Sequence, residues 1–254
     1  MRFEGKVALV TAASRGIGFA VAHGLRAGGA RVAICGRDEA SLAAAAKELG
    51  AFALAGDIGD ASFLERLVRE TETHYGSTID VLVANNGGPP PGGSTEVTEE
   101  QWAAAVQRNL MSAVRLTRLV APGMRSKKWG RIIHMASTTA KEPDDGMVLS
   151  NTTRAATVAF AKTLSRELGP DGVTVNVVLT GAVLTERLRS LLQPAPGTSS
   201  LDEAVAEAAK MFPVRYIPSA DEFAKVVLFL ASTEAGYLTG VALPADGGFM
   251  RSAM

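Results

Sequence analysis

A glycine-containing turn between residues 11 and 18 is the first part of the sequence that could do chemistry. It follows a short apolar run at residues 6–10 and precedes a helical pattern. A turn between a strand and a helix leaves backbone N–H groups free at the positive end of the helix dipole, where they bind phosphate. The same glycines also serve plain packing of a strand against a helix. The candidate pyrophosphate site comprises Thr11, Ser14, Arg15, Gly16, Ile17 and Gly18.

The end of the next apolar run bears on which nicotinamide cofactor such a site would take. NAD-binding sites place an acidic residue about 20 residues after the turn, where it holds the ribose 2′-hydroxyl. Here Gly36 occupies that position and Arg37 follows it. Arg37 and Arg15 could converge on a 2′-phosphate, which suits the guanidinium fork. We therefore expect NADP(H) to be favoured over NAD(H), with two exposed surface arginines as the alternative interpretation.

The elements that must position these residues alternate along nearly the whole chain. Apolar runs predict strands at residues 6–10, 31–35, 52–55, 81–84, 131–135 and 174–179. Helical patterns cover residues 18–28, 39–49, 61–75, 99–124, 151–168 and 201–211. Strands that are apolar on both faces and separated by helices form parallel sheets covered on both sides. The sequence therefore predicts an α/β fold, a Rossmann-type doubly wound parallel sheet, as a single domain over residues 1–254.

Two segments interrupt this alternation and are expected to border a site. Residues 87–93 read Gly-Gly-Pro-Pro-Pro-Gly-Gly, and residues 193–200 are also loop-like. Ligands of open α/β sheets bind beyond the carboxyl ends of the strands, where such loops lie. We expect residues 184–215 to form a substrate lid.

The order of these motifs resembles that of the short-chain dehydrogenase/reductase family over nearly the whole chain. Residues 11–18 are similar to its Thr-Gly-x-x-x-Gly-x-Gly turn, with Ala12 in place of the first glycine, and residues 85–87 are similar to its Asn-Asn-Ala-Gly segment. The resemblance implies that Asp57 and Ile58 contact the adenine and that Thr185 contacts the nicotinamide carboxamide. Besides the turn, the cofactor-binding residues that it implies are Arg37, Asp57, Ile58, Asn85, Asn86, Gly87, Arg154, Gly181, Val183 and Thr185.

The residues at the family's catalytic positions depart from its pattern. The family transfers hydride between a nicotinamide and a carbonyl or alcohol carbon, using a serine, a helix asparagine and a Tyr-x-x-x-Lys pair. Ser137 and Asn109 fill the first two positions, but Ser150 and Arg154 replace the pair. Serine is a far weaker acid than a phenol, whose pKa is about 10, and arginine stays protonated. We predict Ser137, Ser150, Asn109 and Arg154 as the catalytic group, with an atypical proton donor such as water held by Ser150 and Asn109.

Two functions fit these residues. The first is an NADP-dependent oxidoreductase, whose nearest look-alikes are the β-ketoacyl-carrier-protein reductases and the sugar or alcohol dehydrogenases. The second is a catalytically impaired sensor or assembly protein that keeps the nucleotide pocket. The missing tyrosine and lysine favour the second, whereas the presence of Ser137 and Asn109 favours the first, which we adopt.

Composition excludes several other classes. The chain has 26 Lys and Arg against 26 Asp and Glu, and both nucleic acids and anionic membranes require a basic surface. No apolar run approaches the roughly 18 residues of a membrane span. Cys35 is the only cysteine, so we expect no disulfide and no metal. We expect a cytoplasmic protein that acts on a small-molecule carbonyl or alcohol substrate. The family resemblance further implies a homotetramer or homodimer assembled through residues 99–124 and 151–168.

Overall fold

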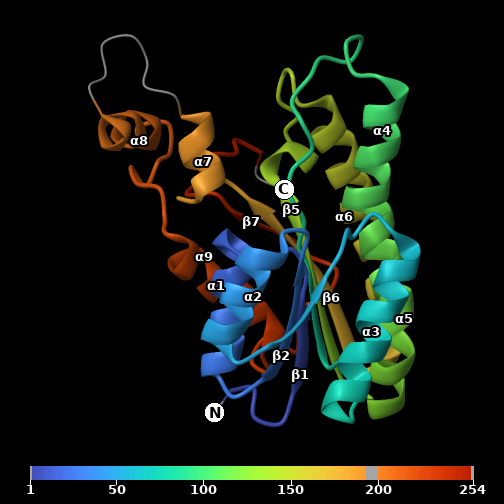
Figure 1. The fold of residues 1–254 in the computed structure, drawn as a ribbon. Helices are drawn as coiled ribbons and strands as arrows, with labels where there is room; N and C mark the ends of the chain where they lie inside the picture. The colour runs from blue at the N-terminus through green and yellow to red at the C-terminus, as the bar shows by residue number, and fades with distance from the viewer. Residues whose placement is uncertain (1, 193–199, 253–254) are drawn as a thin grey trace.

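The computed structural model describes residues 2–192 and 200–252 and contains one seven-stranded parallel sheet (Figure 1). The strand order is β3-β2-β1-β4-β5-β6-β7. The strands are β1 (Val7–Val10), β2 (Arg31–Gly36), β3 (Phe52–Ala55), β4 (Val81–Ala84), β5 (Gly130–Ser137), β6 (Val173–Thr180) and β7 (Ala242–Ala245). The predicted Rossmann-type α/β fold and its six strands are confirmed, and β7 is an additional edge strand.

Helices cover both faces of the sheet (Figure 1). One face carries α1 (Gly16–Ala27), α2 (Glu39–Leu49) and α9 (Ala220–Ala231), and the other carries α3 (Ala61–Tyr75), α5 (Ser112–Lys127) and α6 (Val148–Leu168). Alternate strand residues supply the two cores: Val10 and Ile34 pack under α1, whereas Leu9 and Leu82 pack under α3 and α5. Because every central strand is buried on both faces, its residues are apolar almost without interruption.

The helix predicted over residues 99–124 is interrupted. It consists of α4 (Glu99–Ala105), a π-helical turn η1 (Val106–Met111) and α5. A π-helical turn contains one more residue per backbone hydrogen-bonded turn than an α-helix. Just after η1, the Ser112 hydroxyl donates to the carbonyl oxygen of Arg108 at 2.5 Å. Helical periodicity does not reveal such a bulge, and π-bulges occur frequently at functional sites.

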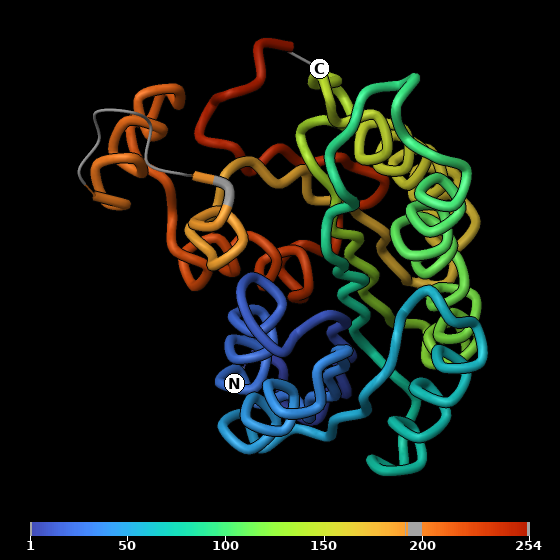
Figure 2. The backbone as a smooth tube through the Cα atoms, turned by 45° about the horizontal axis from the view of Figure 1, so that its top comes forward, coloured from blue at the N-terminus to red at the C-terminus, as the bar shows by residue number. Residues whose placement is uncertain are grey.

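The carboxyl end of the sheet is where the site is assembled. β1 pairs with both β2 and β4, so the strand order reverses between them and opens a crevice at their carboxyl ends. The loop after β4, the start of α6 and the helices α7 (Glu186–Leu191) and α8 (Leu201–Ala209) gather around this end (Figures 1 and 2). Of the loop predicted at residues 193–200, all but Ser200 lies outside the described residues. No helix in the described part of the chain is long and apolar enough to cross a bilayer.

Candidate active site

The glycine turn after β1 is joined to the loop after β4. The Thr11 hydroxyl donates to the carbonyl oxygen of Asn85 at 2.6 Å, and the Asn85 amide side chain donates to the carbonyl oxygen of Ala12 at 3.1 Å. A Cβ on Gly18 would lie 2.5 Å from that same Ala12 oxygen. Only glycine therefore allows α1 to begin this close to the turn. Thr11, Gly18 and Asn85 form one rigid unit at the strand reversal.

The remaining residues of the turn lie along the same crevice. Ala12 has a φ of +49°, a left-handed conformation that costs an alanine roughly 1–2 kcal/mol. The side chain of Ser14 lies beside the end of β2, because a Cβ on Gly36 would come 3.3 Å from its Oγ. Ile17 packs on the core beneath α1, and α1 begins at Gly16, two residues earlier than predicted.

The two arginines expected to converge on a 2′-phosphate have separate neighbours. Arg15 donates to Glu186 Oε2 at 3.2 Å, and both side chains are about three-quarters exposed, at 75% and 77%. Arg37 is exposed beside Asp38, whose carboxylate accepts the backbone N–H of Ser41 at 2.8 Å and caps α2. Their convergence on one phosphate stays a prediction.

The position that the resemblance assigns to adenine contains an ion pair that the sequence did not predict. Arg108 of η1 donates to both carboxylate oxygens of Asp57, at distances from 2.7 to 3.2 Å. This hydrogen bonding holds the pKa of Asp57 below its usual range. Ile58 is buried next to the pair. A cavity of about 300 Å³ is lined by Asp57, Gly59, Asp60, Ala104, Gln107 and Arg108.

The two serines of the predicted catalytic group are connected through Thr139. The Oγ of Ser137, at the end of β5, accepts the backbone N–H of Thr139 at 3.2 Å. The Thr139 hydroxyl lies 3.2 Å from the Ser150 hydroxyl, and either can donate. Ser150 is buried in the first turn of α6, which begins at Val148, three residues earlier than predicted. Ser137, Thr139 and Ser150 therefore form a continuous polar group, in which Thr139 was not predicted.

Arg154 lies one turn of α6 beyond Ser150 and is 5% exposed. Its Nη1 donates to the carbonyl oxygen of Met135 at 2.6 Å, whereas its Nε is buried and has no hydrogen-bond partner among the described residues. Burial and, to a smaller extent, the charge of Arg187 together lower the pKa of this guanidinium to about 10. Arg154 is therefore a cation at neutral pH with donor capacity to spare.

Asn109 occupies the middle of η1 and is 2% exposed. Its side-chain amide donates to Thr153 Oγ1 at 3.4 Å, and its carbonyl oxygen accepts from Thr157 Oγ1 at 3.4 Å. Asn109 is thus fixed against α6 at Thr153 and Thr157, which flank Arg154 in the sequence, and its part in a catalytic group stays a prediction.

The remaining predicted cofactor residues line the facing loops. Thr185 caps α7, and its methyl carbon lies 3.5 Å from the position of a Cβ on Gly16, so it overlies the glycine turn. Gly181 donates its N–H to Ala245 at 3.1 Å, and Val183 is buried. Asn86 has a buried Oδ1 without a hydrogen-bond partner. Gly87 follows it.

The loop after β4 is also joined to the start of α6. Gly92 donates its N–H to Gly146 at 2.6 Å and accepts from the N–H of Val148 at 3.4 Å. The proline-rich loop and the approach to Ser150 therefore form one wall of the crevice.

Within residues 2–192 and 200–252, no three His, Cys, Asp or Glu side chains are grouped as metal ligands.

Comparison with known proteins finds relatives that span the whole chain. The family model described as enoyl-(acyl carrier protein) reductase matches residues 11–250. The 3-oxoacyl-[acyl-carrier-protein] reductase of Escherichia coli is 35% identical over 250 residues, which are 98% of each chain.

Solved structures agree. L-Sorbose reductase from Gluconobacter frateurii, crystallised with NADPH and L-sorbose, superposes with a TM-score of 0.92 at 32% identity and covers 99% of both chains. The actinorhodin polyketide ketoreductase with NADPH has a TM-score of 0.90 at 32% identity, covering 97% of this chain and 98% of that one. The chain belongs to the short-chain dehydrogenase/reductase family.

Proposed function

We propose that this protein is an NADPH-dependent reductase that acts on the carbonyl group of a small molecule, or on the corresponding alcohol in reverse. The observation that carries the proposal is the cluster of three hydroxyl side chains, Ser137, Thr139 and Ser150. The buried cation Arg154 lies one helical turn beyond Ser150. These side chains offer hydrogen-bond donors and positive charge where a carbonyl oxygen would become negative. The relatives' use of NADPH supports the choice of cofactor.

The residues present fit a bound nicotinamide cofactor. The close approach at Gly18 forms a cradle for the pyrophosphate, and the unpaired Nε of Arg154 and Oδ1 of Asn86 are available to a ligand. Arg154 would hold the nicotinamide ribose, Thr185 the carboxamide, and Arg15 and Arg37 the 2′-phosphate. When bound, NADPH supplies the hydride.

The proton must come from a group other than a phenol. Ser137 would hold the substrate oxygen, and Arg154 would stabilise the negative charge that develops on it. The paired hydroxyls of Thr139 and Ser150 can pass a proton, because each is both a donor and an acceptor. We propose that water beside Ser150 and Asn109 is the source of this proton.

One experiment separates this enzyme from the sensor or assembly protein that the missing tyrosine favours. NADPH oxidation is measured against a panel of ketones, oxo acids and quinones for the wild type and for Ser137→Ala. Ser165→Ala is the control, because Ser165 is buried on the same helix as Ser150 and its hydroxyl donates to the carbonyl oxygen of Lys162. We expect turnover by the wild type and the control, and a loss of about 10²-fold in Ser137→Ala. Tight NADPH binding without turnover of any compound would favour the sensor, and turnover only in Ser150→Tyr/Arg154→Lys would contradict the proposal.

We also propose that the protein works as a homodimer or homotetramer in the cytoplasm. The predicted substrate lid spans residues 184–215, and we propose that its described parts, residues 184–192 and 200–215, close over the substrate. The outward face of α6 supports the assembly, because Thr152, Ala155 and Ala159 are small and exposed. Small residues allow two helices to approach closely. The contact of Arg187 in α7 with the loop after β4 supports the lid.

A further inference from the structure

Arg187 reaches from α7 across the crevice to the loop after β4. Its Nη1 lies 3.3 Å from the carbonyl oxygen of Gly88, and its Nη2 lies 3.5 Å from that of Pro89. A Cβ on Gly88 would come 2.8 Å from Nη2, so the guanidinium lies against this loop and the glycine makes room for it. These two long contacts to neutral oxygens leave most of its donor capacity unused.

The charge of Arg187 acts on the buried charge of Arg154. The two guanidinium groups are near enough for Arg187 to lower the pKa of Arg154, in addition to the larger effect of burial. In the described part of the chain, no ion pair within 4.0 Å includes either arginine. The carboxylate next to Arg187 in sequence, Glu186, is paired with Arg15. Among the described residues, the crevice therefore contains two like charges, neither of which has a carboxylate within 4.0 Å.

A second buried arginine shows what a purely structural role looks like in this fold. Arg131 is also 5% exposed, but its guanidinium donates to the carbonyl oxygens of Ser232, Gly130 and Gly172 and lies 4.5 Å from the centre of the Trp129 ring. Arg154 has one such bond. Leaving a buried cation with so few partners beside another cation is unfavourable unless an anion binds between them.

Resting on the proposed function, we infer that the substrate carries a carboxylate, which Arg187 and Arg154 bind while the carbonyl group lies at Ser137. The substrate class is thus an oxo acid. A guanidinium suits this anion because it can donate two parallel hydrogen bonds to the two carboxylate oxygens. Arg187 is the specificity-determining residue, because Arg154 would also hold the cofactor ribose.

The test measures binding, so it does not depend on turnover. Dissociation constants are measured by calorimetry, with and without saturating NADP⁺, for 2-oxopentanoate, 4-oxopentanoate and 5-oxohexanoate and for the methyl ester of each. The proteins are the wild type, Arg187→Met and the control Arg189→Met, whose arginine lies on the same helix and faces Asp202 at 3.8 Å. We expect at least one acid to bind the wild type and the control roughly 10-fold or more tightly than its ester. Arg187→Met should bind the acid about 10-fold more weakly and the ester equally well.

Two results would overturn the inference. Equal binding of every acid and its ester by the wild type would show that the two arginines do not select a carboxylate. A weakened affinity of Arg187→Met for NADP⁺, with the preference for the acid intact, would assign Arg187 to a cofactor phosphate. The proposed function fails in a different way, because selective binding of the acid without any NADPH oxidation would refute the reductase and support the carboxylate site.

Discussion

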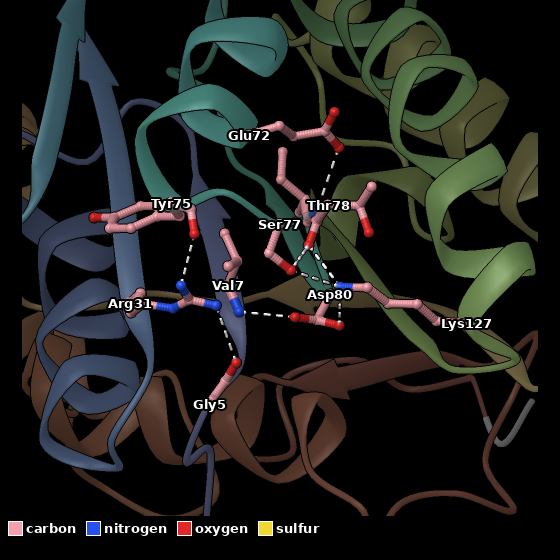
Figure 3. A network of polar contacts seen from close by, with 10 residues as sticks. Gly5, Val7, Arg31, Glu72, Tyr75, Ser77, Thr78, Asp80 and Lys127 are labelled. Atoms are coloured by element: carbon pink, nitrogen blue, oxygen red, sulfur yellow. Dashed lines mark hydrogen bonds and ion pairs between the residues drawn. The ribbon is translucent and has the colours of Figure 1, made fainter.

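The two ends of the sheet treat buried charge in opposite ways. At the amino end, Asp80 is 3% exposed and accepts the backbone N–H of Val7 at 2.8 Å and the ammonium group of Lys127 at 2.9 Å (Figure 3). Lys127 also donates to Ser77 and to the carbonyl oxygen of Thr78. At the carboxyl end, Arg154 is equally buried but has a single bond to one carbonyl oxygen.

This difference in hydrogen bonding distinguishes residues that stabilise the fold from residues that can bind a ligand. Buried polar groups are normally satisfied within the protein, so an unsatisfied one needs a reason. At the amino end, the charged groups of Asp80 and Lys127 complete their bonds internally and join β1, β4 and α5. In the described part of the chain, the carboxyl end keeps one buried polar atom unpaired in each of Arg154 and Asn86, and ligands of such sheets bind at this end.

The largest expected effect is at the amino end. Asp80→Asn leaves the Lys127 ammonium group without its carboxylate and should lower the free energy of unfolding by about 3 kcal/mol, because breaking a buried pair costs 3–5 kcal/mol and Lys127 is partly exposed. The measurement is urea denaturation, with the exposed Glu167→Gln as control. The affinity for NADPH should not change. If Asp80→Asn lost NADPH binding but kept its stability, Asp80 would belong to the binding site and not to the structural network.

A buried histidine between the two ends gives the next largest effect. His134 of β5 is fully buried against Phe160 of α6, and neither ring nitrogen has a hydrogen-bond partner. Burial lowers its pKa from 6.5 to about 4. Between these values the unfolded chain binds a proton that the folded chain excludes, so stability falls as the pH falls. We expect wild type to lose about 2 kcal/mol more than His134→Leu between pH 6.5 and 4. His23→Gln, which changes an exposed histidine, should follow the wild type, and parallel curves for wild type and His134→Leu would contradict the assignment.

The smallest effect has the opposite sign. Arg154→Met removes a buried, nearly unpaired charge and should raise the free energy of unfolding by about 1 kcal/mol while weakening NADPH binding. Arg131→Met is the matched variant, and it should lower stability by about 2 kcal/mol because it breaks hydrogen bonds to two or more carbonyl oxygens. Thermal denaturation and fluorescence titration of NADPH measure both quantities. Equal destabilisation by the two substitutions would mean that Arg154 is as structural as Arg131.

Much of the fold could be predicted because its strands are short, apolar on both faces and separated by helices. β7 was missed because Ala242–Ala245 is an edge strand of only four residues, one of which is a proline. α9 carried a usable signal, since Ser219 caps it and Asp221 and Glu222 occupy its first turn. The π-turn η1 had none, because helical periodicity is the same on either side of a single extra residue.

The residues of the site likewise fall into those that the sequence predicted and those that it did not. Motif spacing placed Ser137, Ser150, Arg154 and Asn109 on elements that do meet. Arg108 and Arg187 were missed because each acts across the crevice on a residue distant in the sequence, Asp57 and Gly88. Such pairs depend on how loops close over the sheet, which local pattern does not specify.

The most direct test of the central claim is hydride transfer itself. The wild type is incubated with NADPH deuterated at the transferred position of C4 and with the oxo acid that it binds best. The mass of the product is then determined by mass spectrometry. We predict a hydroxy acid that contains one deuterium, formed in the wild type and in Arg189→Met. Binding of both ligands without deuterium in any product would contradict the proposed reductase.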